Sequence, residues 1–181
     1  MLRTKNLIYL DYAATTPVDK EVLKEMLPYF SDKFGNASSI HFFGQEAIAA
    51  IDESREKIAK LFDCDFSEII FTGSATESNN LAIKGLIGKI LEFEFQITAN
   101  FSSRKDLRLT SKNTKTLHII STNIEHESVH ESLKELEKAG HEITYLKVDK
   151  NGLISIADLE KNIKNNTLLV SVIYANNEIG T

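Results

Sequence analysis

The chain has 181 residues, of which 42% are hydrophobic and 26% charged, with a formal net charge of −5 and one cysteine. This composition suits one globular domain or a piece of a larger one, and it argues against disorder and against a broad nucleic-acid surface. It also excludes an internal disulfide. No apolar run reaches the ~20 residues of a membrane helix, and residues 7–10 are too short a run for a signal peptide. We therefore expect a soluble, cytoplasmic protein.

Apolar spacing in the first third of the chain predicts helices. Thr16-Pro17 is typical of a helix start, and helical spacing continues through residues 22–30. The small and polar residues 34–41 predict a loop, and a second helix is expected from about 44 to 62. The residues expected on its buried side are Ala47, Ile48, Ile51, Ile58 and Leu61.

The next elements alternate between strand and helix. Residues 69–72 predict a short strand, and a helix is expected around residues 77–84. A strand at 117–120 is followed by a helix from about 126 to 138, with Gly140 where a helix C-cap glycine belongs.

The last third continues this alternation. A core strand is expected at 143–146, a turn at Asn151-Gly152, a short helix at 156–163 capped by Ser155, and a buried strand at 168–173. Strands separated by single helices predict an α/β fold with a mainly parallel sheet.

Residues from about 92 to 115 interrupt the alternation with several phenylalanines and then a polar run. We interpret this stretch as an inserted surface excursion, because long structureless loops are uncommon inside compact domains. Its local excess of Lys and Arg is interpreted as a solvated face rather than a binding patch.

The segment 71–78 has the composition of an anion site. Small residues between a strand and a helix direct free backbone N–H groups and the positive end of the helix dipole at one point. Thr76 adds a hydroxyl that can bond a phosphate oxygen. The alternative is a capping box made by Ser74 and Glu77, which needs no ligand.

Two further segments place polar side chains after predicted strands. His126 opens a helix after one strand, and Asn176-Asn177 follow another. Ligands of open α/β sheets bind at the carboxyl ends of the strands, so these residues and the anion segment are expected at one sheet edge. The alternatives that need no ligand are a helix-capping role for His126 and an ordinary turn at Asn176-Asn177.

A metal site is a separate hypothesis. His126-Glu127-Ser128-Val129-His130 matches the H-E-x-x-H pattern, in which two histidines bind zinc and the glutamate acts as a base, as in a zinc hydrolase. Cys64 is interpreted as an inert side chain, because Asp63 and Asp65 disfavour its thiolate.

Taken together, these motifs resemble the cysteine desulfurases of the NifS/IscS type, within the class V aminotransferase-like, pyridoxal phosphate-dependent fold. The resemblance covers nearly the whole chain except the excursion, and its motifs lie at residues 9–17, 34–41, 71–80, 125–126 and 176–180. It implies the large domain of the aspartate aminotransferase-like fold type I, a three-layer α/β/α arrangement. Residues 1–15 would form an N-terminal segment and residues 16–181 the first part of that domain.

The resemblance also implies a site and a reaction. Ala75 and Thr76 would hold the phosphate of pyridoxal 5'-phosphate (PLP), His126 would stack over its pyridine ring and shuttle protons, and Asn177 would bond its 3-oxygen side. The family reaction takes sulfur from L-cysteine, leaves alanine and passes an enzyme persulfide to iron–sulfur or thiolation pathways. Selenocysteine or another amino acid is an alternative substrate. Sulfur-acceptor or scaffold proteins and a second copy in a homodimer would be the partners.

The family's Schiff-base lysine and persulfide cysteine would lie beyond residue 181, and neither Lys84 nor Cys64 matches their settings. We therefore expect the chain to be an amino-terminal half that is inactive alone. A noncatalytic remnant or a split subunit is the alternative.

Overall fold

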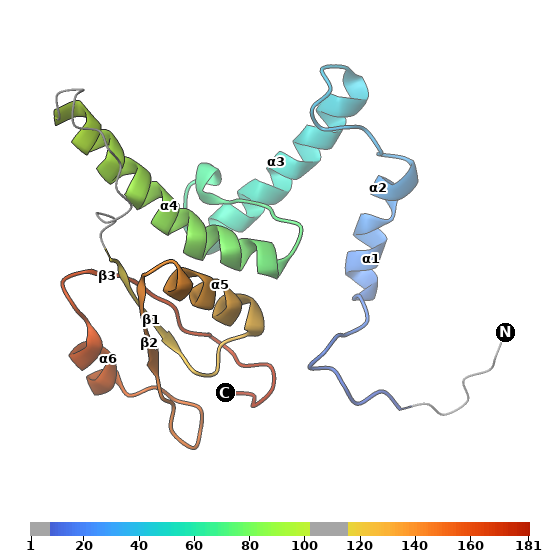
Figure 1. Ribbon diagram of the computed structural model, residues 1–181. Coiled ribbons are helices and arrows are strands. Elements are labelled where there is room, and N and C mark those ends of the chain that lie inside the picture. Colours follow the sequence, from blue (N-terminus) through green and yellow to red (C-terminus); the bar gives the residue numbers. More distant parts are fainter. Residues whose placement is uncertain (1–7, 102–115) are drawn as a thin grey trace. The chain divides into compact units, whose positions relative to one another are not determined.

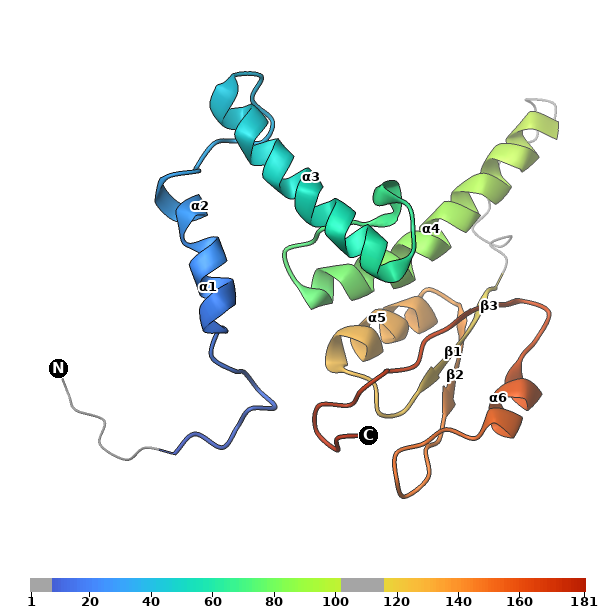
Figure 2. The same cartoon turned by 180° about the vertical axis from the view of Figure 1, so that it is seen from behind.

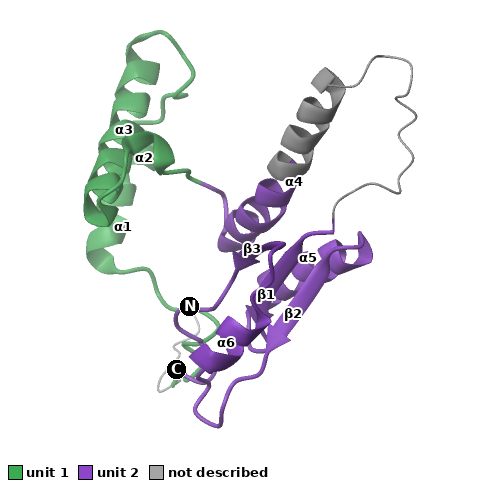
Figure 3. Cartoon of the chain, turned by 90° about the vertical axis from the view of Figure 1, so that its left-hand side faces the viewer, with its two compact units in different colours: residues 1–71 green, residues 72–181 purple. Residues whose placement is uncertain are grey.

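A computed structural model describes residues 8–101 and 116–181, with side chains except at residues 89–101. The chain divides into two compact units, residues 1–71 and 72–181, which Figure 3 shows in different colours. All four residues expected to contact PLP belong to the second unit. The single domain expected from residue 16 onward stays a prediction.

The first unit is helical, and its first helix differs from expectation. The helix α1 (Lys20–Met26) begins four residues after Thr16, because the Asp19 side chain caps it by accepting from the N–H groups of Glu21 and Val22. A second short helix, α2 (Pro28–Ser31), starts at the proline. The expected continuous helix is therefore split, since proline suits a first helical position but cannot extend a hydrogen-bonded helix.

The long helix α3 (Phe42–Phe62) follows the expected loop, and the 3-10 helix η1 (Phe66–Glu68) comes after it (Figure 1). The loop lies so close to α3 that a Cβ atom on Gly35 would come within 1.9 Å of the Phe43 carbonyl oxygen. The expected buried side of α3 is only partly covered: Ala47, Ile48 and Ile58 are half-buried, whereas Ile51 is 37% and Leu61 79% exposed. The amphipathic pattern predicts the helix but not which part of its apolar face is covered.

The strand expected at residues 69–72 is absent from the structure. This segment is extended, yet none of the described strands pairs with it, and a strand requires a hydrogen-bonded neighbour. Within the first unit, Arg55 holds the segment by donating to the Ile69 carbonyl oxygen, and its guanidinium lies 5.0 Å from the centre of the Phe71 ring.

The second unit contains a three-stranded parallel sheet of order β2-β1-β3, which confirms the expected α/β class. Its elements are α4 (Ala75–Phe101), β1 (His118–Thr122), α5 (Glu127–Lys138), β2 (Glu142–Leu146), α6 (Ile156–Asn162) and β3 (Thr167–Val170). Figures 1 and 2 show α5 on one face of this sheet and α6 on the other. Right-handed crossovers require this, because the connection from β1 to β2 and the connection from β2 to β3 cross the sheet in opposite directions.

The core of the second unit lies between the sheet and the α4–α5 helix pair. Ile119 of β1 and Leu133 of α5 have no exposed surface, and Ile83 and Ile87 of α4 belong to the same buried cluster. On the opposite face of β1, the buried His118 ring bonds the hydroxyls of Thr144 and Thr167 on the two neighbouring strands. The sheet is thus fixed from both faces.

Several expected boundaries in this unit are confirmed and two are wrong. The Ser155 side chain caps α6, and Gly140 after α5 and Gly152 in its turn both have positive φ angles. However, α4 runs well beyond residue 84 and includes the start of the expected excursion. The rest of that excursion, residues 102–115, lies outside the described residues. The strand expected to be buried at 168–173 is a half-buried edge strand that ends at Val170.

Candidate functional site

The amino-terminal end of α4 presents backbone donors at the expected anion segment. The Ser74 side chain accepts from the Glu77 N–H at 3.1 Å, and the Glu77 carboxylate accepts from the Gly73 N–H at 2.8 Å. The expected capping box is therefore formed in its first half, while its second half engages Gly73. The N–H groups of Ala75 and Thr76 have no partner within a helix that starts here, so they remain for a ligand.

His126 is the N-cap residue of α5, immediately after the loop that follows β1. Its ring is exposed, and its Nδ1 accepts from the Ser128 N–H at 3.1 Å and lies 2.9 Å from the Ser128 hydroxyl oxygen. The expectation of a helix-capping histidine is thus correct in structure. This capping uses only one ring nitrogen and leaves Nε2 and both ring faces outside the cap.

Asn177 lies in the loop after β3, and two neighbours tie this loop to the one that carries His126. The Asn176 side chain donates to the Ile124 carbonyl oxygen at 2.9 Å. The Glu125 carboxylate accepts from the Thr122 hydroxyl at 2.7 Å and from the Ile173 N–H at 2.8 Å. Because β1 and β3 are parallel, both loops leave the sheet at the same edge, as expected.

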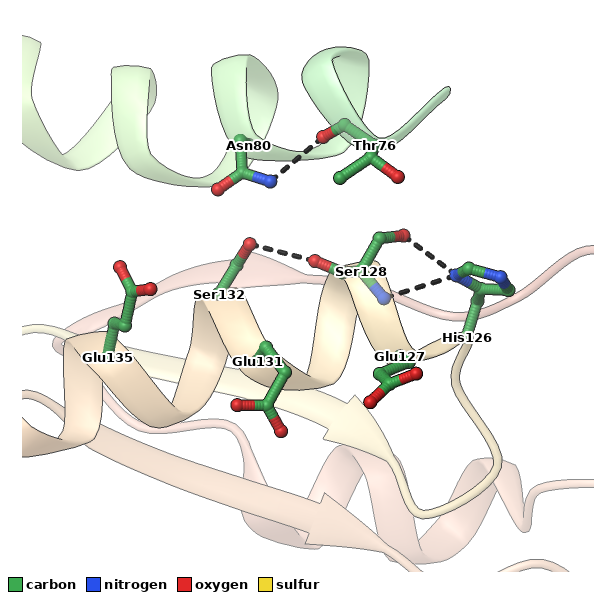
Figure 4. Close-up of a pocket in the computed structure, with 8 residues that line it drawn as sticks. All are labelled: Thr76, Asn80, His126, Glu127, Ser128, Glu131, Ser132 and Glu135. Atoms are coloured by element: carbon green, nitrogen blue, oxygen red, sulfur yellow. Dashed lines mark hydrogen bonds between the residues drawn. The ribbon is translucent and has the colours of Figure 1, made fainter. Parts of the chain in front are cut away.

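Two cavities bring the expected site residues together in pairs. Thr76 and His126 line one of about 320 Å³ between the first turns of α4 and α5, shown in Figure 4. His126 and Asn177 line another cavity of about 520 Å³. Ala75 precedes Thr76 at the helix start and lines neither cavity. The two cavities share His126, Glu127 and Glu131, and His126 is the one expected site residue that lines both.

Carboxylates along α5 line the first cavity, and most of them are paired with lysines. Glu131 accepts from Lys134 at 2.7 Å, which lowers the pKa of the Glu131 carboxyl and raises the pKa of Lys134. Glu135 is paired with Lys84 from α4. These pairs reduce the repulsion that an incoming anion would meet at the end of α4.

The zinc hypothesis finds no support in the structure. His126 turns its Nδ1 toward Ser128, whereas the His130 ring packs edge-on at 5.3 Å from the Tyr145 ring. In the parts of the chain for which side chains are described, no group of three or more His, Cys, Asp or Glu residues is placed to hold a metal ion. Cys64 is a half-buried free thiol after α3, and its inert role stays a prediction.

The Aminotransferase class-V family matches residues 8–101 and 105–181. This chain belongs to that family. Family members use PLP, and the α/β architecture with a parallel sheet is the fold type I expected from the sequence. No helix in the described part of the chain is long and apolar enough to cross a bilayer.

The curated relatives include the cysteine desulfurase IscS of Dictyoglomus turgidum, 47% identical over 98% of this chain and 39% of the relative. A putative cysteine desulfurase IscS 1 of Bacillus subtilis is 45% identical over 96% of the chain and 40% of the relative. Among solved structures, a NifS-like protein matches with a TM-score of 0.79 and 37% identity, covering 96% of this chain and 42% of that one. The structure of SspA in complex with cysteine matches with a TM-score of 0.77 and 40% identity, over 94% and 43%. The chain thus spans about two fifths of the relatives it matches.

The sequence did not predict the hydrogen bonds that four polar residues make at this edge of the sheet. These residues are Asn79, Glu125, Ser128 and Asn176. Ser128 accepts from the Asn79 side chain at 2.8 Å, a contact between residues 49 positions apart. The clue for Glu125 was its place beside His126, directly after a strand. Nothing local to Asn79 or Ser128 indicates that they meet.

Proposed function

We propose that this chain forms the PLP-binding part of a cysteine desulfurase of the NifS/IscS type, with L-cysteine as substrate. One structural observation carries the proposal: the start of α4, the start of α5 and the loop after β3 meet around His126. The relatives named cysteine desulfurase match nearly the whole chain, which favours this activity over others in the class V family.

The residues present fit PLP by the chemistry of their donors. The N–H groups of Ala75 and Thr76, the Thr76 hydroxyl and the positive end of α4 suit a phosphate dianion. The exposed His126 ring offers a flat face to a pyridine ring, and the Asn177 amide offers a donor to an oxygen substituent. Bound PLP supplies an electron sink for the substrate's α-carbon.

Each residue then has a distinct task. Ala75 and Thr76 anchor the phosphate through short hydrogen bonds that strengthen with its negative charge. His126 would stack on the pyridine ring and holds a proton at Nε2. Asn177 would donate to the oxygen substituent of that ring. Glu125 and Asn176 keep the His126 and Asn177 loops at a fixed separation.

We further propose that the 181-residue chain releases no sulfide from L-cysteine by itself. The support is that it spans about two fifths of its relatives and that the sequence motifs expected for the Schiff-base lysine and the persulfide cysteine are not found among its residues. A sulfur-acceptor partner, homodimerisation and a cytoplasmic location stay predictions from the sequence.

A chimera tests the proposed activity. Residues 1–181 are joined to the part of the Bacillus subtilis relative that follows the matched region. Sulfide and alanine are measured after addition of L-cysteine, PLP and a thiol reductant, which supplies the two electrons that release the persulfide sulfur as sulfide. We expect both products in equal amounts from the chimera, and a large loss with His126→Gln. A folded chimera that binds PLP but yields neither product would refute the assignment to cysteine.

A further inference from the structure

The hydrogen bonds around His126 define which of its ring nitrogens carries the proton. A backbone N–H can only donate, and the Ser128 N–H points at Nδ1 of His126 at 3.1 Å. Nδ1 must therefore present its lone pair, and in the neutral ring the proton resides on Nε2. Figure 4 shows Nδ1 turned toward Ser128 and the other ring nitrogen turned away from it.

The Ser128 hydroxyl reinforces this arrangement. Its oxygen lies 2.9 Å from Nδ1, and because Nδ1 accepts, the hydroxyl donates to it. The same oxygen accepts from the Asn79 side-chain amide at 2.8 Å. The bonds run in one direction, from the Asn79 amide to the Ser128 hydroxyl and on to Nδ1 of His126. A chain of this kind polarises each successive bond.

This hydrogen-bond relay, which runs from Asn79 through Ser128 to His126, also joins two helices. Asn79 lies in the first turns of α4, one turn after Thr76, while Ser128 and His126 belong to the start of α5. Asn79 and Ser128 are half-buried, whereas His126 is exposed. The relay thus couples the helix end that presents Ala75 and Thr76 to the ring that lines the same cavity as Thr76.

We propose that Asn79 and Ser128 are positioning residues that hold His126 as its Nε2–H tautomer, so that His126 meets a cavity ligand as a hydrogen-bond donor. This inference rests on the proposed function only for the identity of the ligand, PLP. It assigns roles to Ser128 through its contact with His126 and to Asn79 through its contact with Ser128. It also predicts that the partner of Nε2 is an acceptor atom.

Nitrogen NMR of the 181-residue chain tests the tautomer without any ligand. The chain carries five histidines, and His126→Gln identifies the signals of interest. At about pH 8.5, where neutral histidine dominates, we expect a protonated Nε2 and an unprotonated Nδ1. The chemical shift of Nδ1 should differ from that of a free neutral imidazole because Nδ1 accepts hydrogen bonds. Ser128→Ala removes the hydroxyl but keeps the backbone donor, so the Nδ1 chemical shift should move part of the way toward that of an Nδ1 with no hydrogen bond. Asn79→Ala should move it less, in the same direction.

The matched control is Ser132→Ala, which removes a buried hydroxyl of the same helix that donates to the Ser128 carbonyl oxygen at 2.8 Å. Its Nδ1 signal should equal that of the wild type. A protonated Nδ1 in the wild type, or a Ser128→Ala signal that does not move, would overturn the proposal.

Binding of PLP provides the second readout. We expect Ser128→Ala to weaken it about 2- to 10-fold, the effect of one lost neutral hydrogen bond. If the spectra are as expected but the wild type binds no PLP, the proposed function fails and the assignment of His126 stands. If PLP binds but the Ser128→Ala spectrum equals the wild type, the positioning roles fail and the proposed function stands.

Discussion

Replacing Glu125 by alanine is expected to release the loop after β3 from the loop that carries His126. One carboxylate oxygen of Glu125 accepts from both the Thr122 hydroxyl and the Ile173 N–H, at 2.7 and 2.8 Å. The Thr122 side chain is 1% exposed, so water has little access to the hydroxyl once its partner is gone. Glu125→Ala therefore leaves two donors without an acceptor.

The magnitude follows from those two donors. A buried donor left unsatisfied costs about 1–3 kcal/mol, and the half-buried Ile173 N–H should add about 1 kcal/mol, so the free energy of unfolding should fall by about 2–4 kcal/mol. Glu125→Gln keeps an oxygen in the same place and loses only the charge, so it should cost about 1 kcal/mol. The order of the two variants is thus fixed by the geometry of the bonds.

Urea unfolding followed by circular dichroism at equilibrium measures these differences. The matched control is Glu127→Ala, an exposed carboxylate in the first turn of α5, where the helix dipole contributes about 0.3–1 kcal/mol. A Glu125→Ala variant as stable as Glu127→Ala would refute the role of Glu125 in joining the loops. Equal losses for Glu125→Gln and Glu125→Ala would show that charge, rather than the acceptor oxygen, stabilises the junction.

Two further predictions concern the sheet and its core. Burial lowers the pKa of His118 from its usual 6.5, so the unfolded chain binds the proton more readily than the folded chain. The His118 contribution to stability should therefore be complete above pH 6.5 and be lost as the pH falls through 6.5 toward the lower folded pKa. Urea midpoints measured at a series of pH values should show this slope in the wild type and a flatter slope in His118→Gln. Leu133→Ala removes a side chain with no exposed surface and should cost about 2–5 kcal/mol, whereas a loss below about 1 kcal/mol in the same urea assay would contradict the packing described for α5.

The sequence was sufficient to predict the second unit because its signals are local. Apolar periodicity, the Ser155 cap and glycines with positive φ define the order from β1 to β3, and the parallel sheet follows from the single helices between the strands. Local signals failed where a neighbour decides the outcome. Residues 69–72 have strand composition but no described pairing partner, and Asp19 displaced Thr16 as a helix cap.

The candidate site divides in the same way. The places of His126 and Asn177 could be predicted, because both follow strands that end at one edge of a parallel sheet. The contact between Asn79 and Ser128 could not, because it depends on how α4 packs against α5. Similarly, the H-E-x-x-H pattern predicted zinc from spacing alone, whereas the start of α5 directs His126 toward Ser128 and His130 toward Tyr145.

The central claim is that the start of α4 and the start of α5 form a site for the phosphate and ring of PLP. The most direct test compares equilibrium binding of PLP and of pyridoxal, which lacks the phosphate, to the 181-residue chain. We predict that PLP binds at least about tenfold more tightly, because charge-assisted hydrogen bonds at Ala75 and Thr76 contribute about 1.5–3 kcal/mol each. Equal affinities for the two compounds would contradict the account.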